Sequence, residues 1–426
     1  MDLWTNTDEH DQTLTGATEN GHIAAIRGAR RLSDRATLSL LRSWLLEDFG
    51  AAYCRSLGAS RIFRHCYWID ALGGYTAKSL RAPDEQVHPP SGNGKGKGRQ
   101  KSAAMPLPAA LQPGARLAQA LAQESRPIAL HSLLLSAGSS TRRSRESRQS
   151  DDDNTILSKE SGILATSWLD VASSLLSEIE QSPAIFLLDP LGPTTFSYDD
   201  LAPLYKRTGP TELCFLLAHK QIEHHLRSAA THTAQANALT ALLRSDRWKT
   251  LNAKEDVDIQ GFARMFITSM RRHFQWSPQN IDLPVQNGPA SVASLPYTLI
   301  YATRRSDGLL IMNDALCEYR RRTYRQSYQG VLSEDWFAQQ DQKRLDEGLR
   351  QLREQIQRQG VATRIRRWPD LRQQLILDNF GQFTVQEYDH CLQELIAQQE
   401  VRCVWRQAPE VGSERIPGNE DTLIWS

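Results

Sequence analysis

The stretch PAIFLLDP, residues 183–190, decides the fold. Its apolar residues follow one another without interruption and end at Asp189-Pro190. An apolar run of this length is typical of a parallel strand that helices cover on both faces, because neither face then offers a place for polar side chains. We therefore predict a central, buried strand whose tip carries Asp189.

Strands and helices alternate on both sides of this run. Further strands are expected at 63–70, 127–135, 162–166, 212–218 and 295–303. Helices are expected at 33–53, 115–124, 169–180 and 198–205, and a long helical stretch separates the last two strands. This alternation predicts an α/β domain with a parallel, Rossmann-like, doubly wound sheet.

The composition of the sequence becomes more charged and richer in glutamine beyond residue 325. A charged, glutamine-rich helix is expected at 333–358, two helices at 369–380 and 384–399, and a strand at 401–406. Two helices followed by such a strand predict a winged-helix domain at the C-terminus. We expect a polar lead (1–32), a Rossmann-like domain (33–328), a linking helix (329–362) and a winged-helix-like domain (363–426).

Two segments inside the Rossmann-like domain have a different composition. Residues 82–114 are rich in Pro, Gly, Lys and Ser, and residues 138–155 carry a Ser/Arg run that ends in three aspartates. Segments of this kind bury too little apolar area to offset the entropy lost on folding. We expect both to be disordered insertions.

Bulk properties limit the possible partners. The chain has 426 residues, which favours two domains, and its formal net charge is +1. Attraction to nucleic acid must therefore come from local basic patches. The six cysteines are scattered, without zinc-module spacing, and no run approaches the about 20 apolar residues of a membrane span. We expect a cytoplasmic protein with reduced thiols and no membrane partner.

Two predicted strand tips carry residues suited to ligand binding. The first tip reads Asp70-Ala71-Leu72-Gly73-Gly74, and the second reads Asp189-Pro190-Leu191-Gly192. In open α/β sheets, ligands bind beyond the carboxyl ends of the strands, and glycines let a cofactor approach the backbone. The alternative interpretation is a tight glycine turn and an aspartate that starts a turn or caps a helix.

Basic and aromatic residues cluster in two places near the end of the Rossmann-like domain. Arginines can neutralise phosphates while neighbouring tyrosines stack on bases, so the clusters predict nucleic-acid binding. The alternative is an ordinary solvated helix face. The arginines concerned are Arg304, Arg305, Arg320, Arg321, Arg322 and Arg325.

Other kinds of site have little support in the sequence. His219, His224 and His225 follow a predicted strand, but His224 and His225 are adjacent and would point about 100° apart on a helix. We therefore expect no metal site. No Walker loop, Gly-x-Ser-x-Gly or His-Glu-x-x-His occurs, so no motif favours a P-loop protein or a hydrolase.

The order of these motifs resembles the three-Cys-motif partner family, a group of bacterial and phage-associated proteins. The resemblance covers about residues 34–325 and is strongest at 183–315. It is carried by the first strand tip, Asp189-Pro190-Leu191-Gly192, the strands at 212–216 and 297–303, Gly308 and Met312-Asn313-Asp314-Ala315. It implies a class I methyltransferase fold that uses S-adenosylmethionine, often with a winged-helix tail.

The resemblance also implies roles for the two strand tips. Asp70, Gly73 and Gly74 would bind the methionine end of S-adenosylmethionine, and the catalytic positions Asp189, Pro190 and Gly192 would face the methyl acceptor. The sequence departs from the pattern in the first turn, which lacks a second spaced glycine. It also departs after the strand at 127–135, where Ser136 and Ala137 replace the acid that usually holds the ribose.

Two functions follow as hypotheses. The first is a methyltransferase-like protein that acts on nucleic acid in a mobile-element or defence context, with a three-Cys-motif protein as a possible partner. The second is a catalytically inactive module that binds nucleic acid and a partner protein, which the missing ribose acid favours.

Overall fold

The computed structural model describes most of the chain. The described residues are 34–76, 78–81, 107–136, 161–252, 257–276, 278–286, 291–328, 333–407 and 415–425. The predicted polar lead, the insertion at 138–155 and residues 82–106 of the first insertion lie outside them.

Residues group into two compact units. We call Ser33–Ile281 with Pro296–Arg305 the sheet unit, and Asp282–Leu295 with Ser306–Ser426 the C-terminal unit. The sequence had suggested a boundary near residue 328, so the helix that begins at Ser306 groups here with the C-terminal helices.

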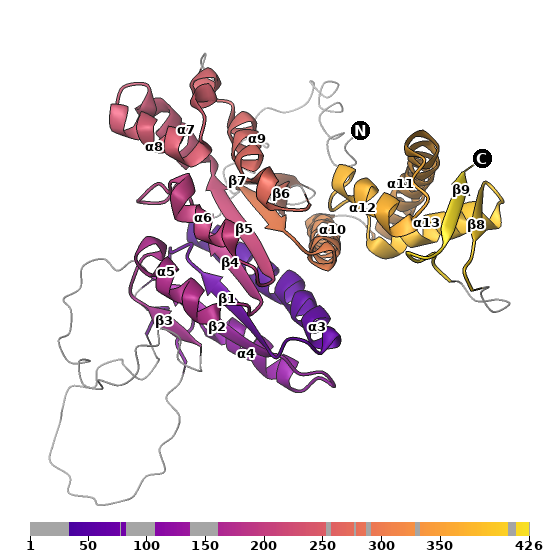
Figure 1. The fold of residues 1–426 in the computed structure, drawn as a ribbon, viewed down its shortest axis with the longest axis horizontal. Coiled ribbons are helices and arrows are strands. Elements are labelled where there is room, and N and C mark those ends of the chain that lie inside the picture. Colours follow the sequence, from indigo (N-terminus) through magenta and orange to yellow (C-terminus); the bar gives the residue numbers. More distant parts are fainter. Residues whose placement is uncertain are drawn as a thin grey trace, which may run out of the picture. The chain divides into compact units, whose positions relative to one another are not determined.

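A seven-stranded sheet dominates the fold, and helices flank it (Figure 1). Its strand order is β3-β2-β1-β4-β5-β7-β6. Strands β1 to β5 pair in parallel, whereas β7 runs antiparallel to β5. The predicted α/β class and a mostly parallel central sheet are confirmed, but the last predicted strand is antiparallel. The strands are β1 (His65–Asp70), β2 (Ala129–Leu135), β3 (Gly162–Leu164), β4 (Ala184–Leu188), β5 (Thr211–Ala218), β6 (Gln279–Gln286) and β7 (Val292–Thr303).

The stretch expected to be wholly helical contains a strand. Helices α7 (His219–Ala229), α8 (Thr233–Leu243) and α9 (Ile259–Met270) precede β6. In β6, the buried Ile281 and Leu283 alternate with more exposed residues, and Pro284 follows them. A strand at the edge of a sheet tolerates proline, and its half-polar pattern gives a weak signal in the sequence.

The helices before β5 have bounds close to the expected ones. The first predicted helix continues through α2 (Asp34–Trp44), a π-helical segment (Leu45–Gly50) and α3 (Ala51–Ser60). The next is α4 (Gln112–Ala122), which begins inside the expected first insertion and has a proline in its first turn, where the missing N–H costs nothing. Helices α5 (Trp168–Ile179) and α6 (Tyr198–Lys206) follow.

The core of the sheet unit centres on β4, whose residues are all fully buried. Aromatic side chains from β4, β5 and α9 join the same cluster, including Phe186, Phe215 and Phe266. The uninterrupted apolar pattern at 184–188 therefore reflects a strand that lies inside the sheet, as predicted.

The C-terminal unit has a separate core. It contains α10 (Ser306–Tyr328), α11 (Glu334–Thr363), α12 (Trp368–Asp378) and α13 (Val385–Ala397). Strands β8 (Val401–Val404) and β9 (Thr422–Trp425) form an antiparallel pair. Trp368, Leu375 and Leu392 are fully buried in this core. The unit is thus a helical bundle with a two-stranded sheet at its end.

Candidate functional site

A cavity of about 500 Å³ opens at the carboxyl ends of the central strands. Gly73 and Gly74 line it from the turn after β1, Asp189 and Gly192 from the turn after β4, and Gln221 from the start of α7. The sheet order reverses between β1 and β4, which is where ligands bind in open α/β sheets. Its volume lies within the range of small-molecule sites.

The turn after β1 requires its glycines. Gly73 and Gly74 have φ angles of +67° and +74°, a region that favours glycine. A Cβ at position 74 would lie 2.9 Å from the side chain of Leu38, whereas one at position 73 would have nothing within 4 Å. The backbone of Gly73 is therefore open to close approach by a ligand.

Asp70 was predicted to bind the cofactor, but its carboxylate faces residues of this chain. It is 1% exposed and forms an ion pair with Arg42, with an Nε–Oδ2 distance of 2.6 Å. The hydroxyl of Tyr75 donates to Oδ2 at 2.5 Å and the amide of Leu72 to Oδ1 at 3.0 Å. Asp70 lines a second cavity rather than the first, so it shapes the turn instead of facing the main site.

Arg42 links Asp70 to the glycine turn. Its Nη2 donates to the carbonyl of Gly73, and its guanidinium lies 4.1 Å from the centre of the Tyr75 ring. Burial, the largest single effect, would lower the pKa of Arg42, but the charge and hydrogen bond of Asp70 together with Tyr75 outweigh it and raise the pKa. Arg42 therefore stays charged.

Asp189 is the acid that faces the main cavity. Its Oδ1 accepts from the amide of Leu191 at 3.0 Å and its Oδ2 from the side-chain amide of Gln221 at 3.2 Å. Burial raises the pKa of Asp189, although these hydrogen bonds and the nearby His225 partly oppose the shift. Among the described residues that line the cavity, Asp189 is the only acid. It is the natural candidate to accept a proton or orient a polar ligand.

Pro190 and Gly192 differ in their positions. Pro190 is buried, does not line the cavity, and its carbonyl accepts the amide of Phe196 at 3.0 Å. Gly192 does line the cavity, but a Cβ there would make only ordinary contacts with Asp189, at 3.5 Å. Pro190 thus shapes the turn that presents Asp189, and Gly192 leaves space beside it.

The cavity also contains polar groups that the sequence did not single out. Trp168 and Gln221 line it, and within the described part of the chain neither Trp168 Nε1 nor Gln221 Oε1 has a hydrogen-bond partner, although both atoms are buried. One is a donor and the other an acceptor, so a polar ligand can satisfy both. The rule that sites follow strand ends would have drawn attention to both, because Gln221 lies three residues after β5 and Trp168 four residues after β3.

The arginines of the first basic cluster make contacts inside the sheet unit. Arg304 donates to the carbonyls of His273 at 2.9 Å, Arg207 at 2.6 Å and Tyr205. Burial lowers the pKa of Arg304. The guanidinium of Arg305 lies 5.9 Å from the ring centre of Phe63. Neither arginine lines the main cavity.

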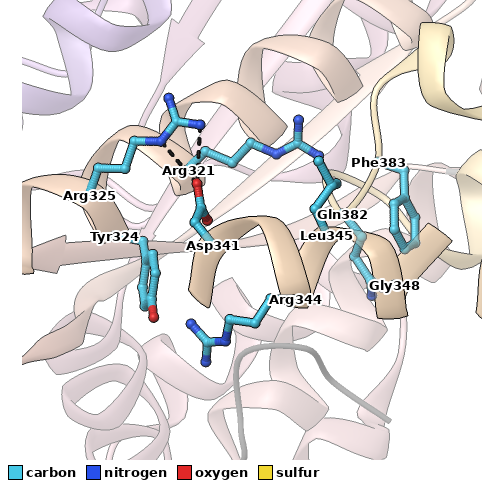
Figure 2. Close-up of a pocket in the computed structure, with 9 residues that line it drawn as sticks. All are labelled: Arg321, Tyr324, Arg325, Asp341, Arg344, Leu345, Gly348, Gln382 and Phe383. Atoms are coloured by element: carbon cyan, nitrogen blue, oxygen red, sulfur yellow. Dashed lines mark hydrogen bonds and ion pairs between the residues drawn. The ribbon is translucent and has the colours of Figure 1, made fainter. Parts of the chain in front are cut away.

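Arginines of the second basic cluster form ion pairs between helices of the C-terminal unit. Arg321 on α10 donates to both carboxylate oxygens of Glu387 on α13, each at 2.8 Å. Arg325 pairs with Asp341 on α11 at 3.3 Å. Figure 2 shows both arginines beside a cavity of about 80 Å³, with Arg325 directed at Asp341. These two guanidinium groups therefore connect α10 to its neighbours.

Arg320 and Arg322 also have partners in the C-terminal unit. Arg320 Nη1 donates to the carbonyls of Phe380 and Gly381, each at 3.2 Å. Arg322 lies 5.9 Å from the ring centre of Tyr319. All six predicted nucleic-acid-binding arginines thus make internal contacts, and the structure does not bring them to one surface of the main cavity.

The histidines near the site also make ordinary hydrogen bonds. His219 Nε2 lies 3.1 Å from the hydroxyl of Thr298, and His225 Nε2 lies 3.1 Å from the carbonyl of Leu191. Within the described ranges, no three His, Cys, Asp or Glu side chains are grouped so that they could hold a metal ion.

Comparisons with known proteins provide no relative. The sequence matches no protein-family model, and no curated protein or solved structure matches the chain. In the part of the chain that the structure describes, no helix has the length and apolarity needed to cross a membrane. Function must therefore be inferred from the cavity and the residues around it.

Proposed function

We propose that this chain is a methyltransferase-like protein that binds S-adenosylmethionine in the main cavity and acts on nucleic acid. The observation that carries the proposal is the single cavity lined by both the glycine turn after β1 and Asp189 after β4. The strand order supports it, because an antiparallel β7 between β5 and β6 is the arrangement of class I methyltransferases.

The wall of the cavity suits a cofactor with many polar groups. The backbone of Gly73 offers close approach, and Trp168 Nε1 and Gln221 Oε1 offer an unpaired donor and acceptor. Ser136 and Thr166, after β2 and β3, line the end where the usual ribose acid is missing. Their hydroxyls would take over part of its role.

Asp189 would act on the methyl acceptor. When bound, S-adenosylmethionine supplies an electrophilic methyl group, and transfer then depends on in-line positioning of the acceptor. The carboxylate of Asp189 would accept a hydrogen bond from an acceptor N–H or O–H, and its raised pKa favours taking up the proton as the new bond forms. Gln221 would hold the carboxylate in place through its side-chain amide.

The C-terminal unit supports a binding role. Helices α12 and α13 followed by the β8–β9 pair have the order of a winged helix, and we propose that residues 363–426 form one. Helix α13 contains no lysine or arginine, and its acids Glu387, Asp389 and Glu394 pair with arginines of the same unit. A helix without basic side chains cannot make the phosphate contacts of a DNA-reading helix, which favours a protein partner. A three-Cys-motif protein from a mobile-element or defence context would be such a partner.

The competing proposal is a catalytically inactive interaction module. It is favoured by the absence of any acid besides Asp189 among the described residues of the cavity wall, because a ribose diol then has no carboxylate acceptor there. The six arginines contact other residues of the chain, so they do not favour one proposal over the other.

Calorimetric titration with S-adenosylmethionine at high protein concentration tests the first proposal. We expect saturable heat, followed by transfer of a labelled methyl group to DNA or RNA. Asp189→Ala should abolish transfer while binding of the cofactor persists. Asp199→Ala is the matched control, because Asp199 is exposed on α6 and does not line the cavity. Absence of binding heat would leave only the interaction module.

A further inference from the structure

A second cavity, of about 280 Å³, is lined by Arg42 and Asp70, neither of which lines the main cavity. Helix α2, the strands β1 and β2, and the start of α4 contribute its wall. Gly74 and Tyr75 line both cavities, so the glycine turn separates the two. None of the roles proposed above uses this second cavity.

A buried hydroxyl group on its wall has no partner. Ser132 on β2 is 3% exposed, and its Oγ makes no hydrogen bond to any of the described residues. Burying an unpaired hydroxyl costs free energy, and buried polar groups in folded proteins almost always have a partner. Because Ser132 lines the cavity, a ligand there can supply the missing partner.

Two positively charged side chains line the same cavity. Arg35 and Arg42 both line it from α2, seven positions apart and thus on the same face of the helix. Arg42 uses Nε and Nη2 for Asp70 and Gly73, and its Nη1 makes no hydrogen bond to the described residues. Asp70 offsets one of the two charges, and Tyr75 stays neutral because burial raises its pKa. Asp70 is the only acid among the described residues that line this cavity, so one of the two arginine charges has no carboxylate partner in its wall.

The start of α4 adds one backbone donor. No side chain caps this helix, which has 11 residues, and Pro113 and Gly114 of its first turn line the cavity. The amides of Gln112 and Ala115 donate to the carbonyls of Ala109 and Leu111, and proline has no N–H, so the amide of Gly114 is the donor that this turn offers. The helix dipole makes this end attractive to anions. Gly114 also lies close to Ser132, since a Cβ at position 114 would be 2.3 Å from the serine Oγ.

We propose that this second cavity binds a phosphate group, through Arg35, Arg42, the hydroxyl of Ser132 and the start of α4. A phosphate has several acceptor oxygens, and a monoanion retains a proton that it can donate, so it matches guanidinium, amide and hydroxyl groups at once. The site does not depend on methyl transfer. The phosphate belongs either to free phosphate or to a nucleic-acid backbone.

The test uses the full-length protein and inorganic phosphate. Thermal unfolding is followed while phosphate replaces chloride at constant ionic strength, and affinity is measured by calorimetry. We expect phosphate to raise the melting temperature of the wild type, and Arg35→Glu to weaken binding by about tenfold or more. Arg116→Glu makes the same charge change on an exposed position of α4 outside the cavity and should leave binding unchanged.

Ser132→Ala separates a ligand contact from a structural role. Removing the unpaired hydroxyl should raise the melting temperature without phosphate and reduce the stabilisation that phosphate gives. A side chain with only a structural role would not produce these opposite changes. The proposal would be overturned if the wild type had the same melting temperature in phosphate and in chloride. It would also be overturned if Arg35→Glu and Arg116→Glu weakened phosphate binding equally.

A short oligonucleotide distinguishes the two sources. If the phosphate belongs to a nucleic-acid backbone, a labelled 12-nucleotide single strand should compete with inorganic phosphate, and Arg35→Glu should weaken both. If only inorganic phosphate binds and the strand does not compete, the site takes free phosphate. Both results support a phosphate site and differ only in its source.

Discussion

Asp70 and Asp189 end neighbouring strands, and the groups around their carboxylates differ. Asp70 is paired with the charged Arg42 and also accepts from Tyr75, so its negative charge is compensated within the chain. Asp189 receives hydrogen bonds from the neutral donors Leu191 and Gln221, and burial raises its pKa. Of the two acids that the sequence proposed for the site, one is structural and the other is available for chemistry.

Removing one partner of the Arg42–Asp70 pair should be costly. Asp70→Ala leaves the guanidinium of Arg42 without its carboxylate, and breaking a buried pair in this way costs about 3–5 kcal/mol. Urea unfolding measures the change. Glu124→Ala is the control, because its pair with Arg55 is exposed and should contribute less than about 1 kcal/mol. Equal effects of the two substitutions would contradict a structural role for Asp70.

The raised pKa of Asp189 makes its effect on stability depend on pH. The folded chain holds this proton more tightly than the unfolded chain, so the protein loses stability as pH rises from the ordinary aspartate pKa through the raised one. Asp189→Asn removes this penalty. It should be more stable than the wild type at about pH 8 and similar to it at about pH 3, where Asp189 of the wild type is largely protonated in both the folded and the unfolded state.

Activity and stability should change in opposite directions in this variant. Asp189→Asn cannot accept a proton, so any methyl transfer should fall by on the order of 10²-fold or more. Denaturant unfolding at the two pH values checks the stability, and labelled methyl transfer checks the activity. A variant that is less stable than the wild type at high pH would show that the carboxylate is held by stronger partners than the neutral donors described.

At the scale of elements, the sequence predicts buried strands well and edge strands poorly. β4 is apolar throughout because both of its faces are covered, so its pattern alone identifies it. β6 alternates buried Ile281 and Leu283 with polar residues and includes a proline, and the sequence placed it in a helical stretch. The direction of β7 depends on its pairing with β5, which residue patterns along one strand do not encode.

The arginines of α10 show the same limit for sites. A run of arginines and tyrosines gives the same sequence pattern whether its side chains bind a phosphate or pack against another helix. Only the fold places Glu387 beside Arg321. It also places Asp341 beside Arg325, as Figure 2 shows. The sequence could place Gly73, Gly74 and Asp189 at the cavity because they follow strands, whereas Arg42 lies on a helix well before the turn that it contacts.

Arg321→Met should therefore weaken the folding of the helices. Glu387 also forms the capping box of α13 with Thr384, so loss of Arg321 leaves a partly buried carboxylate with fewer donors. We expect a cost of about 2 kcal/mol by denaturant unfolding. Arg350→Met is the control, because Arg350 is exposed and its pairs lie along a single helix, so its loss should change the free energy of unfolding much less. A loss of nucleic-acid binding without this loss of stability would instead favour a surface role.

At the scale of the whole molecule, the two units have separate cores. The sheet unit is held by aromatic and aliphatic side chains such as Phe186 and Leu213, and the C-terminal unit by residues such as Trp368 and Leu392. Both cavities with proposed ligands lie in the sheet unit. Ligands that bind there stabilise the unit that holds them, since they bind its folded form only.

Core substitutions in the two units should then affect different unfolding events. Leu213→Ala and Leu392→Ala each remove a fully buried side chain, at a cost of about 2–5 kcal/mol. In scanning calorimetry, we expect Leu392→Ala to lower one transition and Leu213→Ala the other. Binding heats for phosphate or S-adenosylmethionine, taken below both transitions, should be unchanged in Leu392→Ala. A single transition that both substitutions lower equally would mean that the units fold as one, because cooperative unfolding links every core residue to the same event.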